Sequence, residues 1–245
     1  TVEIFGVVKD LATETPSYDV TVESPRLTLN DELRKAVPAT ITRIWDLYQP
    51  TGALGLRLEA RREPEVNAKP TLEMTVTCLG NTAIAGALEY PVSDLTGSIH
   101  YHAPFVDLNH LEAKHGSATI QVHGTIELDP AGNDFNLKIG GTGVPFDEAL
   151  LRTMPEEFRN LLIEQHPNGT LDFTAGVNHR SARNNMPPSS VCDAEIRLID
   201  VGLDPGIALA EMQGKILVQC QLGAEARFIG SINLDQIKIE NKTLS

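Results

Sequence analysis

The sequence is poor in aromatic and basic residues. Aromatic residues make up 5% of the 245 residues, and Trp45 is the single tryptophan. Single-stranded nucleic acid is usually bound by stacking its bases on aromatic rings, and phosphate backbones are bound by an excess of lysine and arginine. Here 20 basic residues face 33 acidic ones, for a net charge of −13. This composition argues against nucleic acid as a partner.

Cysteine and long apolar runs are also scarce. Cys78, Cys192 and Cys220 lack the CxxC spacing of zinc and redox sites. Each lies in an alternating pattern, where a free cysteine behaves as a small apolar residue. The sequence shows neither an 18-residue apolar run nor a basic start followed by an apolar stretch, the patterns of a transmembrane helix and a signal peptide. Because it begins at Thr1, inside an apparent strand, we expect a segment of a longer chain.

Most of the sequence alternates between apolar and polar residues. In residues 54–61, for example, Leu54, Leu56 and Leu58 alternate with Arg57 and Glu59. The same period of two recurs in residues 71–78, 120–128, 135–139 and 216–222, separated by turn-forming stretches such as "DPAGND" and "NMPPSS". One-sided alternation is typical of antiparallel strands with one apolar face, so a mainly β fold is predicted.

An internal duplication interrupts this pattern twice. Residues 26–56 and 143–173 align without a gap, with Pro38 on Pro155 (155 − 38 = 117) and Gly52 on Gly169 at the same offset. We therefore expect a first repeat unit over residues 1–123 and a second over 124–229. Residues 230–245 are expected to start a third unit, because Gly6, Gly124 and Gly230 open similar stretches, "GVV", "GTI" and "GSI".

Each copy of the duplicated stretch predicts a pair of short helices, over about residues 30–48 and about 147–165. Asn30 or Asp31 in the first copy and Asp147 in the second are suitable N-caps, and each proline suits the first turn of the second helix. The second helices carry apolar residues at three-and-four spacing. These side chains are expected to cover an end or edge of the sheet, and they are Ile41, Ile44, Trp45, Phe158, Leu161 and Leu162.

The candidates for chemistry are weak. His100 and His102 would share a face of a strand and could gather a metal ion with His115 or His123, but the second unit has Leu217 and Gln219 at the matching positions. The glycine-rich residues 140–143 lack the lysine of a phosphate-binding loop, so a bend before the helix pair is the better interpretation. No Gly-x-Ser-x-Gly nucleophile elbow occurs. We expect no enzymatic activity, no metal and no cofactor.

The duplicated phrase resembles repeats of bacterial AsmA-like proteins, a superfamily of the cell envelope that includes TamB-type and YhdP-type members. The shared features are an acidic N-cap, "LR", a proline, an apolar and charged run, "PxG" and an alternating strand. A second shared pattern lies in residues 90–128, at Pro91, Leu95, Gly97, Ile99, Val106, Leu108, Leu111, Gly116, Val122, Gly124 and Ile126. The second unit departs from it, because too few residues separate Gly214 from Gly230 for the full pattern.

This resemblance implies a repeating β-groove, a curved antiparallel sheet whose concave apolar face conducts phospholipid acyl chains for envelope or outer-membrane assembly. It further implies a periplasmic segment of a membrane-anchored protein. Its partners would be phospholipid or another acyl-chain ligand and further repeats of the full-length chain, with membrane contact made by parts outside this segment.

The apolar positions of the predicted strands are the candidate groove lining. Their branched and flexible side chains suit hydrocarbon, but they could equally fill closed cores, because apolar faces normally pack together. The alternative is therefore two tandem β-sandwich-like domains that serve as a scaffold or protein-interaction module. The lining candidates are Leu54, Leu56, Leu58, Leu72, Met74, Val76, Ile120, Val122, Ile126, Leu137, Ile139, Leu171, Phe173, Ile216 and Val218.

Overall fold

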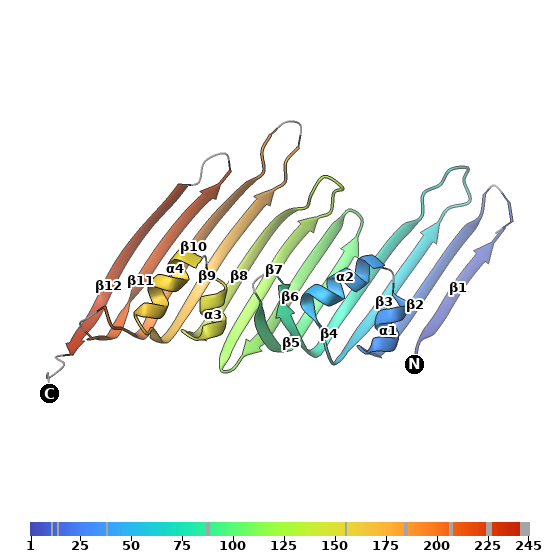
Figure 1. The fold of residues 1–245 in the computed structure, drawn as a ribbon. Helices are drawn as coiled ribbons and strands as arrows, with labels where there is room; N and C mark the ends of the chain where they lie inside the picture. The colour runs from blue at the N-terminus through green and yellow to red at the C-terminus, as the bar shows by residue number, and fades with distance from the viewer. Residues whose placement is uncertain are drawn as a thin grey trace.

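The described part of the chain forms one open antiparallel sheet of twelve strands in a computed structural model (Figure 1). Every strand pairs with its neighbours in the sequence, in the order β1 to β12. The residues that the structure describes are 1–10, 12–13, 15–37, 39–86, 89–154, 156–183, 186–205, 208–223 and 227–240.

The strands are long, and most are joined by short hairpin connections. The bounds are β1 Glu3–Lys9, β2 Ser17–Thr28, β3 Ala53–Arg62, β4 Thr71–Ala85, β5 Tyr90–His102, β6 Phe105–His115, β7 Ala118–Glu127, β8 Asp134–Pro145, β9 Asn168–Arg180, β10 Ser189–Leu203, β11 Ala208–Leu222 and β12 Arg227–Glu240. The prediction of a mainly β fold is confirmed. A pair of β-sandwiches would need two packed sheets, whereas these strands belong to one.

Two helix pairs interrupt the strand order at equivalent places. Helices α1 (Asp31–Ala36) and α2 (Ala39–Tyr48) lie between β2 and β3, and α3 (Glu148–Arg152) and α4 (Glu156–Glu164) lie between β8 and β9. Of the two N-cap candidates in the first copy, Asn30 is the cap and Asp31 is the first residue of α1. The prediction for Asp147 is confirmed, and the side-chain oxygens of Asn30 and Asp147 each accept the backbone N–H three residues later at 2.9 Å. Pro38 and Pro155 lie outside the described residues.

The strands repeat in groups of six. Gly6 in β1 and Gly124 in β7 have φ of +146° and +144°. At both positions the neighbouring strand comes so close that an added Cβ would lie 2.1 Å from a carbonyl oxygen, of Asp19 or of Asn136, which are 117 residues apart. β7 therefore takes the place of β1, and β12 takes the place of β6. The predicted unit boundaries at 123/124 and 229/230 fall inside β7 and β12, where the sheet continues without a break. The equivalence of β12 with β6 makes β12 the last strand of the second group, so it does not support a third unit that starts at Gly230.

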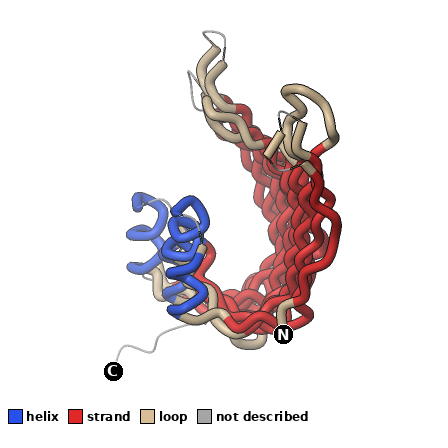
Figure 2. Tube along the Cα trace, turned by 90° about the vertical axis from the view of Figure 1, so that its right-hand side faces the viewer, coloured by secondary structure: helices blue, strands red, loops and turns tan. Residues whose placement is uncertain are grey.

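The sheet is bent into a groove. Figure 2, which looks along the stack of strands, shows them curving toward the side that carries both helix pairs. The helices stand along one rim, and hairpin loops form the other. The prediction of a curved, groove-like sheet with short helix pairs is confirmed.

The fully buried core is small and lies at the helix-bearing end of the strands. One cluster joins Ala118, Val144 and Leu171, and a second joins Leu198, Val201 and Met212. Leu150 of α3 packs against the first cluster, and Phe146, just before α3, packs against both. The groove is thus anchored at one end of its strands, and most of its apolar face is left without a covering layer.

The second helices were expected to cover an end or edge of the sheet with their apolar side chains, and only some of these side chains are covered. Ile41, Ile44 and Leu161 are 37%, 55% and 59% exposed, and Trp45 and Leu162 are half-buried. The side chain of Phe158 lies outside the described residues. The short α3 packs against the sheet instead: Leu151 is buried, and Leu150 contacts the first core cluster. Helices on a rim touch the sheet along one flank only, so part of their apolar surface faces solvent.

Candidate functional site

The register of the sheet brings all fifteen predicted lining residues to one face. Leu58 lies opposite Met74, and Leu56 opposite Val76. From Val76 the row continues through Ile99, Leu108 and Gly124 to Leu137 on β8. A parallel row on the same face crosses the second unit and contains Ile120, Gly141, Phe173, Ile196 and Ile216. The apolar face is therefore continuous from β3 to β11.

This apolar face is the concave one. Leu150 of α3 packs in the same cluster as Ile120, Phe173 and Ile196, so α3 lies over the apolar side of the strands. Both helix pairs stand on the concave side of the sheet (Figure 2). The side chains that alternate with the apolar set consequently point to the convex side.

The lining is only partly covered. Thirteen of the fifteen predicted residues are half-buried, Leu171 is buried, and Leu72 is exposed. In a closed sandwich core such aliphatic side chains would be almost fully buried, because a second sheet would cover them. Neighbouring side chains shield one another across the bend, and the face itself stays accessible.

The sequence patterns missed several lining residues. Ile99, Tyr101, Val106 and Leu108 share the apolar face through β5 and β6. In β6 the alternation of apolar and polar residues breaks at a bulge, where the register with β7 shifts between Leu108 and Leu111. A bulge adds one residue to a strand, so the apolar spacing there changes from two to three and no longer reads as alternation. The stretch "VDLNHLEA" shows this spacing directly.

Small residues give the second half of the groove its depth. Ala175 and Ala194 lie in one cross-strand row between Ile139 and Val218. Beside this row the ring of Phe173 rests over Gly141, where an added Cβ would lie 2.3 Å from the ring. The glycine-rich residues 140–143 do contain the predicted bend, with a register shift between Gly141 and Val144. They also make room for this aromatic ring.

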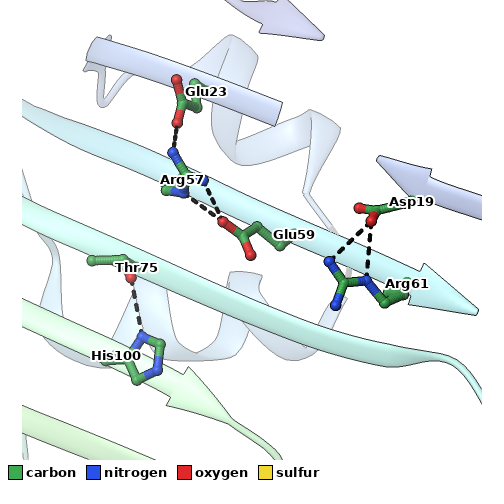
Figure 3. Close-up of polar contacts among 7 residues, drawn as sticks. All are labelled: Asp19, Glu23, Arg57, Glu59, Arg61, Thr75 and His100. Carbon is green, nitrogen blue, oxygen red and sulfur yellow. Dashed lines mark hydrogen bonds and ion pairs between the residues drawn. The ribbon is translucent and has the colours of Figure 1, made fainter. Parts of the chain in front are cut away.

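The convex face carries the charged and polar side chains (Figure 3). Arg57 of β3 pairs with Glu23 of β2 and with Glu59, and the Arg61 Nε donates to Asp19 at 3.1 Å. One strand further, the Thr75 hydroxyl and the His100 Nδ1 are 3.0 Å apart. Each exposed pair of this kind contributes little to the free energy of unfolding, but together they make this part of the convex face polar.

Of the histidines singled out for metal binding, His100, His102 and His123 lie on this convex face. His115 lies on the concave side, where its Nε2 is 2.8 Å from a carboxylate oxygen of Asp147, the N-cap of α3. The Nε2 of His102 is 2.8 Å from a carboxylate oxygen of Asp107, and the Thr125 hydroxyl donates to the other oxygen at 2.7 Å. The Thr125 hydrogen bond, followed by that of His102, lowers the pKa of Asp107. Within the described residues no group of three or more His, Cys, Asp or Glu side chains is placed to hold a metal ion.

The three cysteines lie on the apolar side of the sheet. Cys78 is buried, and Cys192 and Cys220 are cross-strand neighbours that are each half-buried. Burial raises the pKa of the Cys78 thiol. It also raises the pKa of Cys192, where nearby Cys220 adds to the effect. A raised pKa disfavours the thiolate, which is the reactive form, so Cys78 and Cys192 act as apolar lining.

A shallow hollow of about 710 Å³ also lies on the convex face. Its floor includes Gly140 and Gly176, and its walls include Lys138, Asp193 and Glu195. Asp193 already accepts a hydrogen bond from Gln219 at 3.0 Å, and Glu195 pairs with Lys215 at 2.7 Å. The hollow is a furrow between rows of exposed side chains, separate from the concave apolar face.

The helices of the described chain are all too short or too polar to cross a bilayer. Searches of protein-family models, of curated proteins and of solved structures found no match to the chain.

Proposed function

We propose that the concave face binds phospholipid acyl chains and lets them move along the groove, as a non-enzymatic periplasmic segment of a larger envelope protein. The observation that supports this most is the combination of a continuous apolar face with the absence of a covering layer over most of it in the described chain. Exposed apolar surface of this extent marks an interaction site, and its concave, aliphatic character fits hydrocarbon.

The dimensions are suitable for lipid. Strands lie about 4.8 Å apart, so twelve strands make a groove roughly 50 Å long. A leaflet's hydrocarbon layer is about half of the ~30 Å bilayer core, or roughly 15 Å for one acyl chain. The groove would therefore hold several lipids in line. Each methylene removed from water stabilises the complex by about 0.8 kcal/mol.

The chemistry of the face favours chains over headgroups. Val122, Ile139 and Val218 offer no hydrogen-bond donor or acceptor in their side chains, and Met74 offers only a weakly accepting thioether sulfur. A phosphate or glycerol group gains nothing among them and would stay at the open side in water. Such a site distinguishes lipids by their tails rather than by their headgroups.

The test is a charge placed on the concave face. Val122→Asp and Met74→Asp put a carboxylate among half-buried lining residues. Asn178→Asp is the matched control, because Asn178 is exposed on the convex face opposite Asn136 and Val191. Each purified protein is analysed for co-purified phospholipid by mass spectrometry and titrated with a fluorescent phospholipid, with circular dichroism melting in parallel.

The expected result is lipid on the wild type and on Asn178→Asp, and at least a tenfold loss on the two concave-face variants with their melting preserved. Because an accessible carboxylate can stay hydrated, the fold should tolerate it. A lipid-free wild type, or concave-face variants that keep all their lipid, would refute the proposal. An Ala194→Trp variant, which fills the groove without adding charge, should also lose lipid.

A further inference from the structure

Two of the three cysteines lie directly opposite each other in the sheet. Cys192 on β10 is the cross-strand partner of Cys220 on β11. Their row crosses the concave face from Leu137 through Val177 and the two cysteines to Phe228. Both cysteines are half-buried. The two sulfurs therefore share one face of the sheet, and a small reagent in solvent can reach them.

The pairing brings the two residues to the separation of a disulfide. Opposite residues of antiparallel strands have Cα atoms about 4.5 or 5.5 Å apart, according to their place in the hydrogen-bond pattern. Both values lie within the roughly 4.4–6.8 Å between the Cα atoms of disulfide-linked cysteines. The register around the pair is regular, from Ser190 to Leu198. Burial raises the pKa of Cys192 most, and the charge and then the hydrogen bonding of Cys220 add to it, in agreement with neighbouring sulfurs.

The pair lies at the end of the strands that is far from the buried core. The second core cluster includes Leu198 and Met212, and Leu198 is six residues along β10 from Cys192 (198 − 192 = 6), or about 20 Å. At that core end β10 is followed by β11, between Leu203 and Ala208. At the cysteine end, near the rim of hairpin loops (Figure 2), β10 follows β9 and β11 leads to β12. A covalent bond there would fasten the open end of the β10–β11 pair.

We propose that Cys192 and Cys220 are oxidised to a cross-strand disulfide by exchange with a disulfide donor, which fastens β10 to β11 at the loop rim of the groove. The thiolate sulfur of one cysteine attacks the donor disulfide, forms a mixed disulfide and releases one donor thiol. The sulfur of the second cysteine then attacks the protein sulfur of the mixed disulfide and releases the second donor thiol. The two cysteines lose two electrons and two protons, and the donor takes them up as two thiols.

The product suits the place where it forms. A disulfide adds no charge and no hydrogen-bond donor, so the lining of the groove stays apolar. The raised pKa of Cys192 disfavours its thiolate, so the exchange needs an excess of donor. Oxidising compartments such as the periplasm maintain disulfides, so in the cell the modification rests on the proposed location. The pairing itself requires no lipid, and it can fail while lipid binding holds.

Oxidation of the purified chain with excess oxidised glutathione tests the proposal. Remaining thiols are alkylated, and the digested protein is analysed by mass spectrometry without reduction. Cys78 is the internal control, because it is buried and its cross-strand neighbours are Leu54 and Gly97. A register control combines Cys220→Ala with Gln219→Cys, which moves the thiol by one residue to the convex face, opposite Asp193.

The expected product is a peptide pair linked through Cys192 and Cys220, at least tenfold more abundant than any link to Cys78 or to the thiol of the register control. The oxidised wild type should melt roughly 5–10 °C above the same protein after reduction with dithiothreitol. Cys220→Ala should melt at the same temperature before and after reduction, which separates the bond from any effect of the substitution itself.

Three results would overturn the proposal. The first is a folded wild type in which Cys192 and Cys220 remain thiols or carry only glutathione. The second is equal linkage of Cys192 to Cys220 and to the thiol of the register control. The third is a Cys192–Cys220 disulfide that leaves the melting temperature unchanged, because the bond would then not fasten the strands.

Discussion

Replacing Gly124 by alanine should destabilise the protein strongly, although it adds only one methyl group. Gly124 has φ of +144°, and its Cβ would lie 2.1 Å from the carbonyl oxygen of Asn136 and 2.9 Å from the Cα of Leu137. The clash involves backbone rather than a flexible side chain, so β7 and β8 must move apart. The strand pairing in the centre of the sheet would then be disturbed.

The magnitude follows from three contributions. A non-glycine residue in such a backbone conformation costs about 1–3 kcal/mol, and overpacking costs about 1–3 kcal/mol more. The loss of flexibility in the unfolded chain offsets about 0.4–1 kcal/mol of this. The free energy of unfolding should therefore fall by roughly 1–5 kcal/mol, a large fraction of the about 5–15 kcal/mol typical of proteins.

Urea denaturation followed by circular dichroism measures this effect. The control is Gly176→Ala on β9, where an added Cβ meets no atom within 4 Å and no positive φ is required. Its denaturation midpoint should stay within the range of ordinary surface substitutions, about ±0.5 kcal/mol. If Gly124→Ala were as stable as Gly176→Ala, the close approach of β8 to Gly124 would not exist in the folded protein.

Three further changes test other parts of the fold. Asn81→Ala should lower the free energy of unfolding by roughly 2–4 kcal/mol, measured by urea denaturation, because each of three lost hydrogen bonds contributes about 1 kcal/mol. The buried amide donates to Thr51 O and Ala53 O and accepts from Leu79 N. Burial, followed by the Asp147 carboxylate, raises the pKa of Tyr90 to about 12. Stability should therefore decline as the pH rises from about 10, the unfolded value, to about 12. Tyr90→Phe should abolish that decline. At neutral pH the substitution should not destabilise the protein, because the buried hydroxyl has no hydrogen-bond partner among the described residues. If the decline is unchanged in Tyr90→Phe, a group other than Tyr90 causes it. Ile44→Ser should change the melting temperature little, since Ile44 is 55% exposed. A large drop in melting temperature would show that Ile44 is buried in the folded protein.

The duplication and the N-caps were predictable because they depend on local sequence. Asn30 and Asp147 each bond to an amide three residues away, so no distant part of the chain is needed to recognise them. The lining residues of β3, β4 and β7 to β9 were also predictable, since alternation alone assigns them to one face. At Leu108 and Leu111 the same reasoning failed, because a bulge is decided by how two strands pair and not by either strand alone.

The sequence by itself determined that there would be strands with one apolar face, interrupted twice by a pair of short helices 117 residues apart. Alternation and capping are short-range properties, and they follow directly from the order of the residues. Only the tertiary structure decided that the apolar faces form one open, curved sheet rather than two closed sandwiches. The same residues could satisfy either arrangement. The choice depends on long-range features: the close approaches at Gly6 and Gly124, the packing of Leu150 over the strand ends, and the order in which twelve strands pair.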